Sequence, residues 1–145
     1  MKLQYGKRLV ALDYGTKRIG MAQSDPLGMF AQPTGTFDHA GVFRAIEALL
    51  SRNEIEKILV GYPLNDNGTP NRMTAVVDRF VEELRATCLE LPVEKVDEHR
   101  SSREAMQILV SAGTSRKQRA TKGRLDRTAA CIILQHYLDS HPRTP

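Results

Sequence analysis

The sequence predicts an α/β fold in which short apolar strands alternate with amphipathic helices. Arg8 to Asp13 and Arg18 to Ser24 have the composition of two strands joined by a Gly-containing turn, so the chain should begin with an antiparallel hairpin. Further along, short apolar runs are followed by segments with helical spacing of apolar residues. This alternation favours parallel strand pairing, in which functional groups collect where strands end and loops begin.

The later elements follow from the same spacing. The Pro- and Gly-rich segment from Asp25 to Asp38 is expected to be a loop. After it we expect, in chain order, a helix around 42–50, a strand at 57–61, a helix over 71–89, a strand at 93–97, a helix around 105–109 and a helix over 126–138. The strand at 57–61 is continuously apolar, which indicates burial on both of its faces.

Length and composition favour a small intracellular protein. At 145 residues we expect one domain over 1–145, with a frayed tail at 139–145. The apolar runs are too short for a membrane span, and residues 1–6 lack the apolar core of a signal peptide, so we expect a cytoplasmic location. Cys88 and Cys131 form no C-x-x-C pair and are interpreted as buried thiols.

The charge balance favours a polyanionic partner. The chain has 21 Lys and Arg against 17 Asp and Glu, a net charge of +4, and an acidic site would leave the remaining surface more basic still. The segment from Gly113 to Arg124 is basic, contains no acid and directly precedes Asp126, so it could bring phosphate groups to a metal. The candidate nucleic-acid-binding residues are Lys17, Arg18, Arg100, Arg116, Lys117, Arg119, Lys122 and Arg124.

Three acidic residues stand where the expected elements begin or end. Asp13 ends the first strand, Glu98 follows the strand at 93–97, and Asp126 opens the last helical segment. Asp126 shares a helical face with apolar residues such as Ala130, and a carboxylate on a buried face needs a cation, hydrogen-bond donors or a shared metal. Since Mg²⁺ and Mn²⁺ prefer carboxylate ligands, the three acids are candidate catalytic residues that hold two such ions for phosphodiester cleavage.

Each feature also has an ordinary interpretation. Asp13 fits turn chemistry, Asp126 fits a helix N-cap, and Glu98 beside Arg100 fits a surface ion pair. The basic segment alone is typical of a solvated loop, and His99 could be structural or could carry a proton next to Glu98. Taken together, the features favour the metal-dependent nuclease.

Four blocks of sequence stand out along the chain. They are Ala11-Leu12-Asp13-Tyr14-Gly15-Thr16-Lys17-Arg18-Ile19-Gly20, Val60-Gly61-Tyr62-Pro63-Leu64-Asn65-Asp66-Asn67-Gly68-Thr69, Asp97-Glu98 with Ser101-Ser102-Arg103-Glu104-Ala105, and Lys122-Gly123-Arg124-Leu125-Asp126 before Ala129-Ala130. In order and spacing, from about residue 8 to 138, they resemble the YqgF (RuvX) family. The resemblance implies an RNase H-like fold related to the RuvC Holliday junction resolvases, with a central mixed sheet that starts with an antiparallel hairpin and is flanked by helices.

The resemblance also implies a function. It points to a divalent-metal-dependent nuclease for the 5′ end of precursor 16S ribosomal RNA, with Asp13, Glu98 and Asp126 as the metal-binding catalytic carboxylates and Lys122 near the phosphate. Branched DNA is the other substrate that it implies, and symmetric cutting of a junction would favour a homodimer. A non-catalytic nucleic-acid-binding module of the same fold is a further alternative.

A last alternative comes from Asp13-x-Gly15-Thr16, which also resembles the phosphate-binding hairpin of actin-like ATPases and sugar kinases. Those enzymes need a second lobe to close over the nucleotide, and 145 residues are too few to supply it.

Two departures from the family pattern bear on the metal. His99 stands directly after Glu98, where the family usually has Arg. RuvC-like resolvases carry a second acid one turn from the helix Asp, whereas Gly123 and Ala129 stand three residues to either side of Asp126. Because this chain then has one metal ligand fewer than the RuvC-like resolvases, we expect weak metal affinity or a preference for Mn²⁺.

Overall fold

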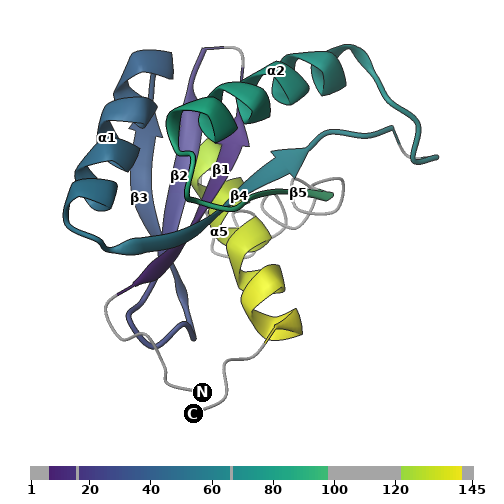
Figure 1. The fold of residues 1–145 in the computed structure, drawn as a ribbon. Coiled ribbons are helices and arrows are strands. Elements are labelled where there is room, and N and C mark those ends of the chain that lie inside the picture. The colour runs from purple at the N-terminus through teal and green to yellow at the C-terminus, as the bar shows by residue number, and fades with distance from the viewer. Residues whose placement is uncertain (1–6, 16, 66, 98–121, 142–145) are drawn as a thin grey trace.

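A mixed sheet forms the centre of the protein (Figure 1). The structure, a computed structural model, describes residues 7–15, 17–65, 67–97 and 122–141, without the side chains of 122–128. Within these residues the strands lie in the order β3-β2-β1-β4-β5. Their bounds are β1 Arg8–Tyr14, β2 Ile19–Ser24, β3 Ala31–Phe37, β4 Ile55–Tyr62 and β5 Val93–Asp97. β2 is antiparallel to β1 and β3, while β1, β4 and β5 are parallel, so the expected N-terminal hairpin and mixed sheet are confirmed.

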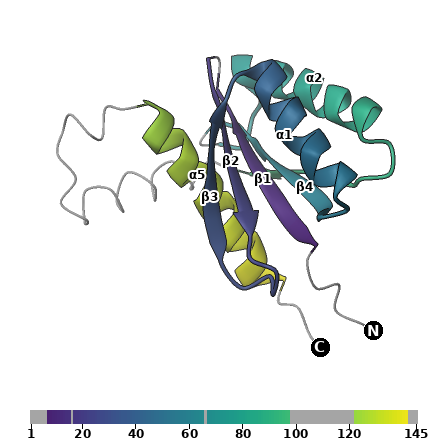
Figure 2. The same ribbon diagram turned by 90° about the vertical axis from the view of Figure 1, so that its left-hand side faces the viewer.

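Helices cover both faces of this sheet. Helices α1 (His39–Ser51) and α2 (Arg72–Thr87) lie on one face, and α5 (Lys122–Ser140) lies on the other (Figure 2). Two apolar cores result, one on each face. In β4, Ile58 and Val60 belong to the first core and Leu59 to the second, which confirms burial on both faces. No helix in the described part of the chain is long and apolar enough to cross a membrane.

The alternation of side chains along β1 decides which face its last residues join. Val10 and Leu12 pack in the core under α1 and α2, whereas Leu9 and Ala11 pack in the core under α5. Successive side chains of a strand point to opposite faces, so the position of Asp13 belongs with the α5 face.

The expected loop over 25–38 is wrong in its second half, which forms β3. Pro33 lies opposite Ala22 and Gly35 opposite Met21, next to a shift in the pairing register. Pro and Gly weaken a strand in the middle of a sheet, but β3 is an edge strand, where a missing N–H and an irregular register are tolerated. The Pro and Gly residues in the second half of this segment therefore indicate an edge strand and not a loop.

The expected start of the last helix is also wrong. Helix α5 begins at Lys122, so Asp126 lies inside the helix, and the N-cap interpretation of this residue is excluded. Lys122 and Arg124 likewise belong to the helix and not to a basic loop. Lys, Arg and Leu favour helix formation, whereas the apolar spacing used for the prediction marks only the buried face. The helix expected around 105–109 lies outside the described residues.

The remaining helices begin with side-chain caps. Asp38 caps α1 by accepting a hydrogen bond from the backbone N–H of Gly41 at 2.6 Å. Asn71 and Thr74 form a reciprocal capping box at the start of α2. Cys88, directly after α2, is buried as expected, whereas Cys131 on α5 is only half-buried, because α5 presents it at the margin of the core.

Candidate active site

The register of the parallel strands locates the predicted residue Asp13 at one end of the sheet. Leu12 of β1 pairs with Val60 of β4, and Val60 pairs with Lys95 of β5, so the carboxyl ends of the three strands lie together. Asp13 comes one residue after Leu12 in this register. Glu98, directly after the end of β5, lies outside the described residues. The end of the sheet at which the parallel strands β1, β4 and β5 finish is called the carboxyl edge below, and the end at which they begin is called the amino edge.

Helix α5 runs antiparallel to β1 (Figure 2), and hydrogen bonds near its C-terminal end fix its level along the strand. The Oε1 atom of Gln135 accepts a bond from the backbone N–H of Ala31 at 2.9 Å, and its Nε2 atom donates to the carbonyl of Met29 at 3.0 Å. Ala31 pairs with Ser24, and the Ser24 Oγ atom accepts from the backbone N–H of Leu9 at 2.9 Å. Gln135 is therefore level with the beginning of β1.

This register places position 126 level with Asp13. Asp13 lies four residues beyond Leu9, about 13 Å along a strand that rises about 3.3 Å per residue. Position 126 lies nine residues before Gln135, about 13.5 Å along a helix that rises about 1.5 Å per residue. Figure 2 shows the same arrangement, with the N-terminal end of α5 near the carboxyl end of β1.

Position 126 also falls on the stripe of α5 that faces the sheet. It precedes Ala130 by four residues and Ile133 by seven, and both are buried in the core with Leu9 and Ala11. The positions of Asp13 and Asp126 thus share one face and one end of the sheet, although their residue numbers differ by more than a hundred.

The surroundings of Asp13 are partly open and basic. Asp13 is half-buried at the end of β1, where its backbone pairs with Gly20. The hairpin turn closes with a hydrogen bond of 2.9 Å from the Gly15 N–H to the Arg18 carbonyl. Lys17 and Arg18 are exposed in this turn. They therefore lie next to Asp13 in the hairpin, as an approaching phosphate would require.

The other predicted cations cannot all be located in this way. Lys122 and Arg124 belong to the first turns of α5, and this end of the helix lies near the carboxyl edge. The remaining ones, Arg100, Arg116, Lys117 and Arg119, lie outside the described residues.

A polar cluster beside the carboxyl edge was not predicted from the sequence. The Tyr62 hydroxyl at the end of β4 donates to Asp78 of α2 at 3.1 Å, and Lys95 Nζ of β5 donates to Asp78 at 3.0 Å and lies 4.7 Å from the Tyr62 ring centre. The bond from Lys95 lowers the pKa of Asp78, while desolvation and the bond to Asp78 raise the pKa of Tyr62. These residues come from three elements, so no local sequence spacing could have revealed them.

The donor set suits a hard cation. Among the side chains that the structure describes, no three His, Cys, Asp or Glu residues come together as metal ligands, and the side chains of Glu98 and Asp126 are outside that set. Asp13 offers a half-buried carboxylate at the edge, and the residues predicted to join it are also carboxylates, the ligands that Mg²⁺ and Mn²⁺ prefer.

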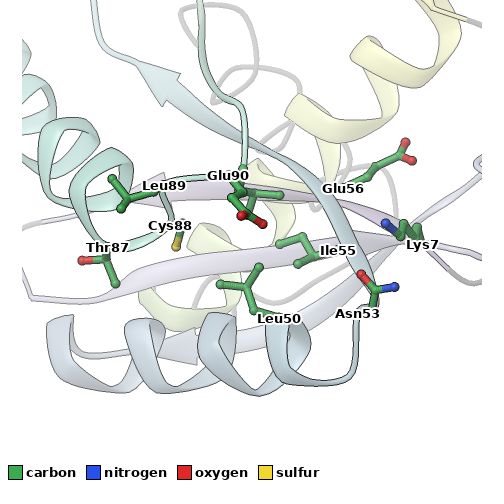
Figure 3. Close-up of a pocket in the computed structure, with 10 residues that line it drawn as sticks. Lys7, Leu50, Asn53, Ile55, Glu56, Thr87, Cys88, Leu89 and Glu90 are labelled. Atoms are coloured by element: carbon green, nitrogen blue, oxygen red, sulfur yellow. The ribbon is translucent and has the colours of Figure 1, made fainter.

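A separate cleft of about 530 Å³ opens at the opposite, amino edge of the parallel strands (Figure 3). Leu50, Ile55 and Cys88 contribute to its lining, and burial raises the pKa of the Cys88 thiol. None of the residues that line it is a predicted site residue. In open α/β sheets, ligands bind outside the carboxyl ends of the strands, so we place the candidate site at the carboxyl edge and not in this cleft.

Sequence comparison relates the chain to known proteins along most of its length. A family model described as "RuvX: Holliday junction resolvase" matches residues 7–140. A relative from Chlorobium chlorochromatii, named "Putative pre-16S rRNA nuclease", is 56% identical over 92% of this chain and 95% of its own length. A relative of the same name from Chlorobaculum tepidum is 58% identical over 93% of this chain and 95% of its own length.

The fold has a solved counterpart. T. thermophilus RuvC, solved in complex with a Holliday junction substrate, superposes with a TM-score of 0.55 at 12% sequence identity. The match covers 94% of this chain and 96% of RuvC. At this identity the likeness concerns the fold, and it confirms the RNase H-like architecture expected from the sequence.

Proposed function

Because the chain belongs to the RuvX family of Holliday junction resolvases, and is a nuclease by that membership and by its relatives, we propose that it cleaves precursor 16S rRNA at the 5′ end with divalent metal ions. We assign Asp13, Glu98 and Asp126 as the metal-binding catalytic carboxylates.

One observation carries the assignment of the carboxylates. The positions of Asp13 and Asp126 lie on the same face and at the same level of the sheet, held there by the strand register and by the Gln135 contacts. Two ionised carboxylates brought to one end of the sheet would repel each other. A shared cation removes that repulsion, which supports a metal site.

The chemistry then divides between the ions and the protein. When bound, Mg²⁺ or Mn²⁺ lowers the pKa of the attacking water and stabilises the charge on the leaving oxygen. The protein holds these ions through Asp13, Glu98 and Asp126. The exposed Lys17 and Arg18 bind the phosphate backbone beside Asp13, and such contacts make binding depend on salt.

The choice of substrate rests on the relatives. Both Chlorobi relatives cover nearly the whole chain and carry a precursor 16S rRNA nuclease name, so ribosomal RNA is our first choice. The family description names the Holliday junction instead, and a four-way DNA junction is therefore the second candidate. Symmetric cutting of a junction would require two copies of the chain.

Cleavage of labelled substrates tests the proposal. We would incubate end-labelled precursor 16S leader RNA, a four-way DNA junction and plain duplex with Mg²⁺, Mn²⁺ or EDTA. We expect cleavage of the leader RNA, stronger activity with Mn²⁺ because one ligand is missing from the helix, and none with EDTA. Cutting of the junction alone would favour the second candidate.

The matched variants are Asp126→Asn and Asp139→Asn. Both make the same change on α5, but Asp139 is exposed at the far end of the helix, beside Gln135. We expect Asp126→Asn to lower the cleavage rate by at least about 100-fold, as removal of a transition-state contact does, and Asp139→Asn to leave it unchanged. Metal-independent cutting, or equal rates in both variants, would contradict the assignment.

A further inference from the structure

The loop between β4 and α2 projects from the carboxyl edge (Figure 1). Its described residues are 63–65 and 67–71, and together they are called the finger below. Since β4 lies between β1 and β5, the finger leaves the sheet one strand from Asp13, about 4.8 Å in the direction across the strands. The base of the finger is therefore next to the candidate site, and its tip projects outward from the sheet (Figure 1).

The finger is built as a rigid unit. Its two sides pair through a bond of 2.9 Å from the Asn65 N–H to the Thr69 carbonyl, and the Gly68 N–H donates to the Asn65 carbonyl at 2.8 Å. At the base, the buried hydroxyl of Thr74 in α2 donates to the Pro63 carbonyl at 2.7 Å. A loop fixed at both ends and across its middle presents its tip in one geometry.

The tip carries neutral hydrogen-bonding groups. Asn67 and Thr69 are exposed, and the Asn67 Oδ1 atom accepts from the Thr69 N–H at 3.1 Å and from the Thr69 hydroxyl at 2.6 Å. These bonds orient the carboxamide so that its NH₂ group points away from Thr69. Gly68, with a φ of +82°, has open space where a Cβ would stand, so the tip itself is sterically accessible.

The charge of the finger disfavours phosphate. Residues 63–71 contain no Lys or Arg, and the sequence adds one acid, Asp66, whose placement lies outside the described residues. This composition contrasts with the hairpin turn of Lys17 and Arg18 at the same edge. Cations suit phosphates, whereas amides and hydroxyls suit base edges and sugar hydroxyls.

The Thr69 hydroxyl donates to Asn67 and accepts from Asn65 Nδ2 at 3.0 Å, so the Asn67 NH₂ group is the donor that the tip presents outward. We propose that this NH₂ group binds neutral polar groups of the nucleic acid next to the candidate site, and so contributes to substrate selection. This inference rests on the proposed nuclease function. Phosphate contacts from the cations position the substrate in any sequence, while contacts to bases or sugars distinguish one substrate from another. The finger thus supplies the selective part of binding.

Binding measurements in EDTA test the inference without cleavage. Fluorescence anisotropy would give Kd for a labelled precursor 16S leader RNA and for DNA of the same sequence, over a series of salt concentrations. For the variant Asn67→Ala, we expect Kd to rise about 3- to 10-fold, as for the loss of one or two hydrogen bonds. We expect the salt slope to stay unchanged, because no phosphate contact is lost.

The two probes separate the possible groups. A loss confined to the RNA identifies a sugar hydroxyl, and an equal loss on both probes identifies base edges. An unchanged Kd on both probes, or a reduced salt slope, would overturn the inference.

A matched charge substitution tests proximity. Asn67→Asp keeps the Oδ1 acceptor for Thr69, so the finger keeps its fold while gaining a negative charge. Asn53→Asp makes the same change at the amino edge, at a residue with a φ of 56° that Asp also tolerates. We expect Asn67→Asp to weaken binding at low salt several-fold more than Asn53→Asp. Equal effects of the two variants would contradict the inference.

The outcome for the finger can be separated from that for the proposed function. If the wild type cleaves RNA and the finger variants bind normally, the inference about the finger fails alone. If the finger variants bind weakly but no metal supports cleavage by the wild type, the proposed function fails and the finger remains a nucleic-acid-binding element.

Discussion

Gln135 of α5 and Ala31 of β3 are joined by a hydrogen bond of 2.9 Å, although they lie 104 residues apart in the chain. The bond runs from the backbone N–H at the start of the edge strand to the side-chain Oε1 atom, and the Nε2 atom of the same side chain donates to the Met29 carbonyl. Gln135 thereby fixes how far α5 lies along the sheet. The level of Asp126 relative to Asp13 depends on this bond.

Replacing Gln135 should lower both stability and activity. Gln135→Ala removes two hydrogen bonds to the backbone, so the free energy of unfolding should fall by about 1–2 kcal/mol in urea titrations. The cleavage rate should also fall, because α5 loses a contact that sets its register. Gln135→Glu tests the donor half of the contact: it keeps the acceptor for Ala31 but sets a carboxylate against the Met29 carbonyl and Asp139, so at pH 7 it should be no more stable than the Ala variant. Unchanged stability in Gln135→Ala would show that the apolar core alone positions the helix.

Thr74 should be a sensitive position at the base of the finger. Its hydroxyl donates to the Pro63 carbonyl and accepts from the Asn71 N–H at 2.8 Å, and the residue is buried. Thr74→Val keeps the shape of the side chain but removes the hydroxyl that bonds to the Pro63 carbonyl and the Asn71 N–H. The free energy of unfolding should therefore fall by about 1–3 kcal/mol. Thr74→Ser keeps the hydroxyl and should retain most of that stability. Equal losses in thermal or urea unfolding of the two variants would indicate that packing, and not the hydroxyl, stabilises this junction.

The Asp78 carboxylate should make stability depend on acid pH. Its folded pKa is lowered below 3.8 by the bond from Lys95, so its contribution is fully present above the unfolded pKa and is lost as the pH falls through the lower folded pKa. Asp78→Asn should therefore destabilise the protein at pH 7, by less than about 1 kcal/mol because the pair is partly exposed. Well below pH 3.8 the variant and the wild type should converge. Urea titrations across this range measure the difference, and a constant difference would contradict the ionic contribution.

The hairpin cations should control the salt dependence of substrate binding. The double variant Lys17→Ala with Arg18→Ala should weaken binding to leader RNA and reduce the slope of log K against log salt by up to about two. The control is Arg44→Ala. Arg44 is an exposed cation on α1, which lies on the face of the sheet opposite α5, so this variant should leave the slope unchanged. Equal slopes in wild type and double variant would place the phosphate path elsewhere.

The sequence predicted most elements because their apolar residues recur with the period of the element. The spacing at Val77, Phe80 and Leu84 predicted α2, and the continuous run at 57–61 predicted a strand buried on both faces. It failed for β3, where an edge strand tolerates Pro33 and Gly35. It also failed for the first turn of α5, where polar residues carry no periodic signal.

The sequence by itself determined the family to which these blocks belong, and it supplied the candidates for the chemistry: the carboxylates Asp13, Glu98 and Asp126, and cations at the hairpin turn and before the last helix. Their residue types and local spacing already contain that information. Only the tertiary structure decided that the positions of Asp13 and Asp126 share one level, and that Tyr62, Asp78 and Lys95 join on the opposite face of the sheet, beside α2. Such proximity depends on strand register and on contacts between distant segments, which no local pattern encodes.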